Sequence, residues 1–511
     1  MKRIAIIFFL LPVFAVQAQK KANPTTFAKT ITPDDLKKHL YTIAGKEMEG
    51  RGTPSPGLDR AAAYIENHFR SLGLLPGNKD GYLQTYPLYK DSVTGAELKV
   101  NGTPFELNKD YQPSAAFNYT ANMRFSEAVF AGYGIVDGAI DDYKDLDVKG
   151  KLVIIADGAP ADYKSSITGF RSPSFWYAKY NVAQNKGAAA ILLVASNFPR
   201  KAGPPTNQYS MSGYKKELSP NLFTVSAAIA ENILGNDSKG FWDKMKSSSI
   251  AKKTYEANVD LGYSKNTTLA YASNVLGVLE GTDLKDEYVF ITGHYDHLGK
   301  RDTVIYYGAD DDGSGTTTVL QLATAFAKAK AAGKGPRRTM VFMTVSGEEK
   351  GLWGSEYYTD HPLFPLEKTT VDLNIDMVGR MDDSRKKGDS TNYVYVVGDD
   401  KVSSDLKTIS EAVNKKYTKV ELDYKFNDPK DPERIYFRSD HYNFAKNGVP
   451  IIFYYDGMLD ADYHKPTDTP DKINYNLMAK RGQLIFYTAW EMANRNEMLK
   501  RDIPLEKPKG F

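Results

Sequence analysis

Residues 288–297 read YVFITGHYDH, an apolar run of strand length that is followed at once by histidine, aspartate and a second histidine. Further apolar runs of strand length follow at 339–345, 370–375, 393–397 and 450–454. Helical patterns fit between and after these runs, at 316–331, 350–358, 402–416 and 477–494. Continuous apolar strands that alternate with helices are typical of a parallel sheet covered on both faces. The sequence therefore predicts an α/β fold with a mostly parallel central sheet flanked by helices.

The chain before residue 288 shows two kinds of sequence pattern, one helical and one of short strands and loops. Helices are predicted from Thr32, where a capping residue precedes proline and two acids, and over 58–72, where apolar residues recur at helical spacing. From about residue 105 to 255, short β-like runs alternate with Gly, Pro, Ser and Tyr, and histidine is absent. These runs cover 130–135, 152–156 and 190–195, with a helix at 177–186. We interpret 106–254 as a β-rich domain inserted into a catalytic domain formed by 19–105 and 255–511.

The first 18 residues are typical of a secretory signal peptide. Lys2 and Arg3 precede an apolar run at 4–16, and Val16-Gln17-Ala18 offers small residues for cleavage. The run is too short to span a bilayer, and no later stretch of the sequence reaches the roughly 18 apolar residues that a span needs. We expect a periplasmic or secreted protein without a membrane anchor, exported after cleavage near Ala18.

The composition excludes several classes of function. The 511 residues include 66 basic and 63 acidic side chains, and a net charge of +3 gives no indication of a nucleic-acid partner. The absence of cysteine removes thiol nucleophiles, iron–sulfur clusters and cysteine-bound zinc. The G-x-S-x-G, H-E-x-x-H and P-loop patterns are also absent from the sequence. Any metal site must therefore be built from His, Asp and Glu.

Histidines and carboxylates follow four of the predicted strands. They are His294 and Asp296, Glu348 and Glu349, Asp376, and His464 in the loop beyond the strand 450–454. A further group, Asp310–Asp312, lies in a glycine-rich loop before the helix 316–331. Ligands of open α/β sheets bind beyond the carboxyl ends of the strands, so these side chains are expected to meet at one edge.

A cluster of two histidines and three or more carboxylates suits a divalent ion, with zinc as the leading candidate. Five ligands are too many for one tetrahedral zinc that must also keep a water. They fit two ions that share a bridging carboxylate and a bridging water or hydroxide. The sequence therefore predicts two Zn²⁺ per chain.

These motifs, in this order, resemble those of the exported co-catalytic dizinc exopeptidases, which include aminopeptidase Y, bacterial leucyl aminopeptidases and glutamate carboxypeptidase. The resemblance covers about residues 30–100 and 260–495. The segment between them resembles a protease-associated (PA) domain, through FAGYGI at 130–135, the acidic and glycine motifs at 142–151, and GAAA at 187–190. The resemblance implies the zinc exopeptidase fold, which is phosphorylase/hydrolase-like, and peptides as substrates.

The resemblance also implies the metal ligands. His294 and Asp376 would bind one zinc, Glu349 and His464 would bind the other, and Asp311 would bridge the two ions.

Three further residues are implied to serve catalysis. Glu348 would be the general base that moves a proton from the metal-bound water to the leaving amine. Tyr463 would donate its hydroxyl to the oxyanion of the tetrahedral intermediate. Asp296 is interpreted as the acceptor that fixes the tautomer of His294. The family also implies a cis peptide bond between Asp311 and Asp312.

The remaining histidines are not assigned as ligands. His39, His68 and His361 are interpreted as structural or surface residues. His297 and His441 lie close to the motifs, and a supporting or substrate-side role is left open for the segment Ser439-Asp440-His441.

The sequence leaves alternative functions open. The main hypothesis is a metallo-aminopeptidase, and the runner-up is a carboxypeptidase of the glutamate type. Such a carboxypeptidase would hold a substrate carboxylate with arginines of the insert, for which Arg124, Arg171 and Arg200 are available. A single-zinc glutaminyl cyclase would not need the full ligand set. An inactive receptor-like relative would have lost ligands or the base, and all of them are present.

Overall fold

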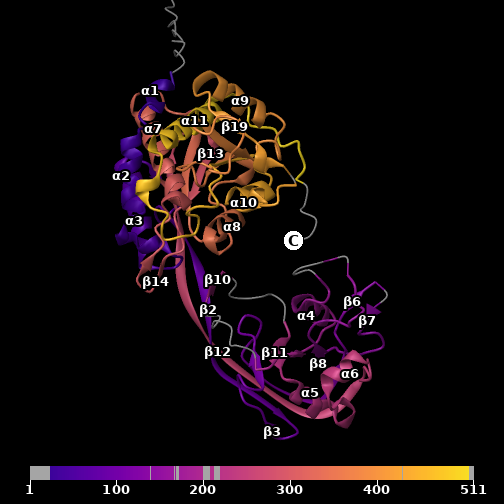
Figure 1. The fold of residues 1–511 in the computed structure, drawn as a ribbon. Helices are drawn as coiled ribbons and strands as arrows, with labels where there is room; N and C mark the ends of the chain where they lie inside the picture. Colours follow the sequence, from indigo (N-terminus) through magenta and orange to yellow (C-terminus); the bar gives the residue numbers. More distant parts are fainter. Residues whose placement is uncertain are drawn as a thin grey trace, which may run out of the picture. The chain divides into compact units, whose positions relative to one another are not determined.

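The computed structural model describes residues 23–138, 140–165, 167, 172–199, 208–211, 219–428 and 430–505. The expected signal peptide, Arg171 and Arg200 lie outside these residues. The chain divides into two compact units: one comprises the described residues up to Tyr86 and from Ala272 onward, and the other is Pro87–Tyr271 (Figure 1). The second unit is longer than the insert expected at 106–254, because the long strands β2 (Leu83–Val100) and β12 (Thr254–Leu279) run from one unit into the other.

The first unit is built on a mostly parallel sheet, as the sequence predicts. The strand order is β12–β16–β13–β17–β20–β18–β19. The central strands β16, β13, β17 and β20 are mutually parallel, whereas β12 pairs antiparallel with β16 and β18 pairs antiparallel with β20. The edge strand β19 pairs parallel with β18. The bounds are β13 Leu284–His294, β16 Arg338–Val345, β17 Thr369–Ile375, β18 Tyr393–Val397, β19 Glu421–Asp423 and β20 Ile451–Tyr455. Short strands in this unit are β1 (Leu75–Pro76), β14 (Lys300–Arg301) and β15 (Val304–Ile305).

Helices cover both faces of this sheet. On one face lie α7 (Gly315–Ala331) and α11 (Tyr475–Asn494), which contact β13 and β16. Helices α1 (Thr25–Ala28), α2 (Pro33–Ile43) and α3 (Pro56–Ser71) pack on α7, and α9 (Leu406–Tyr417) packs on α11 (Figure 1). On the other face, α8 (Trp353–Asp360) and α10 (His441–Lys446) supply Tyr358 and Phe444 to a core that includes Phe290 and Val341.

Local sequence signals explain where these elements begin. Thr32 caps α2 by accepting a hydrogen bond from the backbone N–H of Asp35, and Ser55 caps α3 in the same way; proline follows each cap. The helix expected from residue 350 begins instead at Trp353, because Gly351 and Leu352 have positive φ angles of 112° and 63°. The strands β16 and β17 are buried throughout, which explains the apolar residues that dominate β16; in β17 the buried Asp372 and Asn374 accept hydrogen bonds from the Thr292 hydroxyl.

The second unit has a smaller sheet with helices on both sides. Its order is β12–β5–β8–β9–β11–β4, in which β5, β8, β9 and β11 are parallel. The strands are β5 Ala121–Phe130, β8 Leu152–Ala156, β9 Ala190–Val194, β11 Asn221–Val225 and β4 Tyr111–Pro113, with short strands β3 Thr103–Pro104, β6 Val136–Asp137, β7 Ile140–Asp141 and β10 Tyr209–Ser210. Helix α4 (Trp176–Asn185) packs on one apolar cluster, and α5 (Ala227–Leu234) and α6 (Phe241–Lys246) pack on another.

The prediction of a strand at 130–135 is wrong. The strand β5 ends at Phe130, and residues 131–135 turn, since Gly132 and Gly134 adopt left-handed φ angles of 55° and 69°. Their buried apolar neighbours Ala131 and Ile135 produced the strand-like pattern.

Among the residues that the structure describes, no helix is long and apolar enough to cross a membrane.

Candidate metal centre

The predicted site residues meet at one edge of the sheet of the first unit. Strand β13 ends at His294, Asp376 follows β17 directly, and Glu348 and Glu349 lie just beyond β16. Asp311 lies in the segment 309–314 that leads into α7. The carboxyl ends of parallel strands therefore bring these side chains together, as the sequence predicts.

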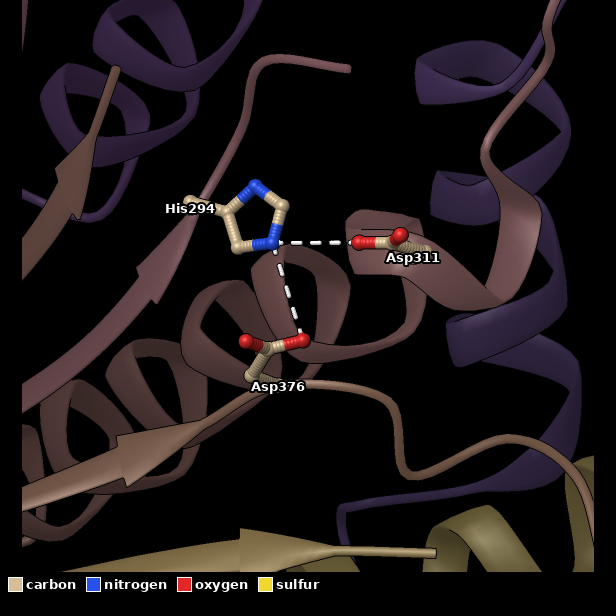
Figure 2. Close-up of side chains that lie close together, drawn as sticks. All are labelled: His294, Asp311 and Asp376. Carbon is tan, nitrogen blue, oxygen red and sulfur yellow. Dashed lines mark ion pairs between the residues drawn. The ribbon is translucent and has the colours of Figure 1, made fainter. Parts of the chain in front are cut away.

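His294, Asp311 and Asp376 form the first group of ligand-type atoms. Nε2 of His294 lies 3.2 Å from Oδ1 of Asp311 and 3.6 Å from Oδ1 of Asp376. Figure 2 shows the two carboxylates directed at the same ring nitrogen. All three residues are buried, and their ligand atoms lie within 4.8 Å of one another.

A second group lies on the other side of Asp311. Nε2 of His464 is 3.1 Å from Oδ2 of Asp311 and 3.1 Å from Oε2 of Glu349. Asp311 therefore presents Oδ1 to His294 and Oδ2 to His464, which is the arrangement of a bridging carboxylate.

These spacings fit metal coordination. Two donors bound to one tetrahedral zinc at their usual bond lengths lie about 3.3 Å apart. The four contacts above span 3.1 to 3.6 Å. In addition, His294 Nε2 and Asp311 Oδ2 are buried without a hydrogen-bond partner, and buried polar atoms are otherwise nearly always paired. The residues therefore fit two divalent ions held on either side of Asp311.

Asp312 fixes the backbone around the bridging residue. Its Oδ1 accepts hydrogen bonds from the N–H groups of Gly315 (2.8 Å) and Met377 (3.0 Å), and its Oδ2 accepts from the N–H of His294 (3.1 Å). One carboxylate thus ties together the ends of β13 and β17 and the start of α7. The Asp311–Asp312 peptide bond is cis, which confirms the expectation. Gly315 is required here, because a Cβ would lie 2.3 Å from the carbonyl oxygen of Ile375.

Asp296 contacts the site differently from the expectation. Nδ1 of His294 lies 3.1 Å from the backbone carbonyl of Asp296 but 3.6 Å from its Oδ1. The carboxylate instead accepts hydrogen bonds from the Thr53 hydroxyl (2.9 Å) and the backbone N–H of Glu348 (3.2 Å). The side chain of Asp296 therefore supports the segment that carries Glu348, and the main chain of Asp296 faces the imidazole.

Glu348 and Tyr463 line a pocket next to the two groups. Asp311 and Asp376 line its polar side, and the apolar side is formed by Met377, Ile435, Phe453, Tyr455 and Leu459. Oε2 of Glu348 lies 3.9 Å from Nε2 of His294. Burial raises the pKa of Glu348 well above its usual value, and Glu349 and Asp376 raise it further while His294 opposes the shift.

Arg438 also lines this pocket and donates a hydrogen bond from Nη2 to Oη of Tyr463 at 3.1 Å. The phenol oxygen accepts from the guanidinium, so its own proton is free to point elsewhere. The ring of Tyr463 stacks on that of His464, with centroids 3.9 Å apart.

The structure places His297 in the second group, although the sequence analysis did not assign it as a ligand. Its Nδ1 lies 2.7 Å from Oε1 of Glu349 and 3.9 Å from Oδ2 of Asp311. Its position three residues after His294, in the same strand-end motif, was the signal that could have identified it. By contrast, His441 is buried against Phe453 and hydrogen-bonds the Tyr436 carbonyl, and burial lowers its pKa to about 3.

Comparison with known families points to the same part of the chain. Residues 274–489, which carry these two groups of donors, match the family model described as peptidase family M28.

Similar proteins carry related names. A "Probable leucine aminopeptidase" of Arthroderma otae is 30% identical over 220 residues, which are 42% of this chain and 56% of the relative. Aminopeptidase YwaD of Bacillus subtilis is 24% identical over 490 residues, covering 91% of this chain and 86% of the relative. The chain spans about half the length of the fungal relatives that it matches. An aminopeptidase from Aneurinibacillus sp. strain AM-1 has a similar fold, with a TM-score of 0.52 and 17% identity over 95% of this chain and 100% of that one.

Proposed function

We propose that the protein is an exported dizinc metallo-aminopeptidase that removes N-terminal residues from peptides. The observation that carries this proposal is Asp311, whose two carboxylate oxygens face separate donor sets, one with His294 and Asp376 and the other with His464 and Glu349. Two relatives that are named aminopeptidases match this chain, one over 220 residues and the other over 490 residues. Their names support the same activity.

The metal centre has a defined chemical purpose in this proposal. Zinc bound on either side of Asp311 would polarise the scissile carbonyl and lower the pKa of a shared water. Each ion would have one imidazole and carboxylate oxygen donors, the ligand types that zinc accepts when sulfur is absent.

Glu348 acts as the general base. Its carboxylate lines the pocket and lies close to His294, and burial raises its pKa above the usual value of a glutamate. It takes a proton from the attacking water as the new C–O bond forms. When the C–N bond breaks, the same carboxyl group gives that proton to the leaving amine. The hydrogen bond from the Glu348 N–H to Asp296 holds the base in place.

Tyr463 stabilises the negative charge that develops on the carbonyl oxygen. Because its oxygen accepts from Arg438, the phenol proton is available for the oxyanion. Arg438 is thus a positioning residue for Tyr463.

The pocket indicates the class of substrate. Its apolar wall of Met377, Ile435, Phe453, Tyr455 and Leu459 favours an apolar N-terminal side chain.

The remaining parts of the proposal concern the other segments of the chain. Residues 1–18 are proposed as the signal peptide for export, and the inserted unit is proposed as a PA domain. Arg124 is exposed and forms an ion pair with Asp260 at 2.7 Å, so nothing at this residue favours a carboxypeptidase over an aminopeptidase.

Two measurements test the function. The purified chain should contain two zinc ions by mass spectrometry of metals, and Glu348→Gln should keep both ions while turnover falls about 10²- to 10⁴-fold. One apolar peptide is then offered with a free and with an acetylated N-terminus. Cleavage of the free form alone supports an aminopeptidase, whereas removal of C-terminal residues from both forms would contradict it.

A further inference from the structure

His297 is fully buried beside the second donor group, and the two-zinc proposal gives it no role. Its Nδ1 lies 2.7 Å from Oε1 of Glu349 in an ion-pair contact, and in the described part of the chain neither atom has a recorded hydrogen-bond partner. A buried imidazole and a buried carboxylate oxygen in such close contact require an explanation, because unpaired buried polar groups are costly.

Distances distinguish a metal ligand from a hydrogen-bond donor. Donor atoms around one tetrahedral zinc lie about 3.3 Å apart, and the contacts of His464 with Asp311 and Glu349, at 3.1 Å each, match that spacing. The contact of His297 with Glu349, at 2.7 Å, is the length of a charge-assisted hydrogen bond instead. Its distance to Oδ2 of Asp311, 3.9 Å, is longer than the spacing of shared ligands.

The two oxygens of Glu349 therefore have different neighbours. Oε2 faces His464, and Oε1 faces His297. A donor on Oε1 would leave Oε2 as the single oxygen directed at the ion. Groups that hydrogen-bond a metal ligand from behind fix its orientation and raise metal affinity.

The backbone and its neighbours hold the His297 ring in place. Its backbone N–H donates to the carbonyl of Arg51 at 3.2 Å. The ring lies so close to Gly308 that a Cβ there would approach the ring atoms to 2.4 Å. The ring also meets that of His464 edge-on, with centroids 5.8 Å apart. The position of Nδ1 is thus set by packing as well as by Glu349.

We propose that His297 is a positioning residue for the second metal ion: its Nδ1–H donates to Oε1 of Glu349 and presents Oε2 as the metal-binding oxygen. This inference rests on the two-zinc site of the proposed function.

Zinc binding to the full chain tests it. The metal-free protein is titrated with zinc against a chromogenic chelator, which resolves the two affinities without measuring activity. His297→Ala should weaken one of the two ions about 10- to 100-fold and leave the other unchanged. His297→Asn should recover most of that affinity, because its amide nitrogen can donate from nearly the position of Nδ1 but is a poor zinc ligand. His361→Ala, at an exposed histidine, is the matched control and should bind as the unmodified chain does.

The outcomes separate this inference from the proposed function. An unmodified chain that binds no zinc would overturn both. Two zinc ions in the unmodified chain, with unchanged affinities in His297→Ala, would overturn the role of His297 alone.

A crystal structure of the zinc-loaded unmodified chain gives an answer even if the variants fail to fold. A hydrogen bond from Nδ1 to Oε1, with zinc on Oε2, supports the inference. A zinc–Nδ1 bond of about 2.1 Å would overturn it.

Discussion

Replacing Arg51 by methionine should strongly destabilise the first unit. The guanidinium is fully buried and donates hydrogen bonds to four backbone carbonyls. These acceptors are Tyr295 at 2.7 Å and Ile43, Tyr307 and Gly308 at 2.8 Å each. The side chain thus ties the segment of Asp296 to the segment that leads to Asp311.

The expected loss can be worked from these contacts. Four hydrogen bonds from a charged donor, at about 1.5–3 kcal/mol each, would total about 6–12 kcal/mol if they were additive. Removing a buried charge also recovers its desolvation cost of several kcal/mol. However, the carboxylates of Asp296 and Asp312, which favour the charged form of Arg51, would lose their nearby cation. We expect a net loss of about 3–5 kcal/mol in the free energy of unfolding.

Chemical denaturation of the full chain measures this loss. A matched control is Arg60→Met, at an exposed arginine paired with Glu49, which should cost less than about 1 kcal/mol. Arg51→Lys keeps the charge without the planar fork of donors and should fall between the two. A loss below about 1 kcal/mol for Arg51→Met would refute the idea that its four hydrogen bonds hold these segments together.

Three further results are expected. Tyr463→Phe should lower kcat about 10²- to 10³-fold with little change in KM in steady-state kinetics, because the hydroxyl acts on the oxyanion. A rise in KM of that size with an unchanged kcat would contradict this role. Asp462→Asn should make unfolding less sensitive to acid. Burial by itself would raise the pKa of Asp462, but hydrogen bonds from Lys472, Thr467 and Arg380 lower it to about 2. The stability that this carboxylate contributes is therefore present above about pH 4 and lost as the pH falls towards 2, as a comparison of unfolding across that range would reveal. Finally, free zinc at 100 times its Kd should stabilise the chain by about 2.7 kcal/mol per ion relative to the chelated protein, and equal melting temperatures would contradict metal binding.

The sequence predicts the sheet and its carboxyl edge well, for a physical reason. Strands buried on both faces are mostly apolar, as in 339–345, and charged residues that directly follow such a run are expected at the strand end. His294, Asp376 and the Glu348–Glu349 pair were therefore found from pattern and order alone.

The remaining features depend on contacts that a linear pattern does not contain. Arg51 meets Tyr295 across 244 residues, so its function as a tie could not be predicted. His297 follows Asp296 directly, and only the path of the chain decides that its ring faces Glu349. The turn at 131–135 reads as a strand because its side chains are buried, while the φ angles of its glycines are invisible in the sequence.

The division of the first unit between two distant parts of the chain has a consequence for how the protein is made. Its N-terminal helices pack on α7 and α11, and Gln483 donates to the carbonyl of Ile31 across 452 residues. During synthesis, the first helices must wait for residue 331 before α7 is complete, and for residue 494 before α11 is complete. Pro87–Tyr271 is continuous and can fold as soon as it emerges, so the interior unit is expected to precede the metal-binding one. The N-terminal helices and α11 are separated by at least about 400 residues of chain, and bringing such distant segments together has an entropic cost. We therefore expect the docking of the N-terminal helices to be the slow step in assembly.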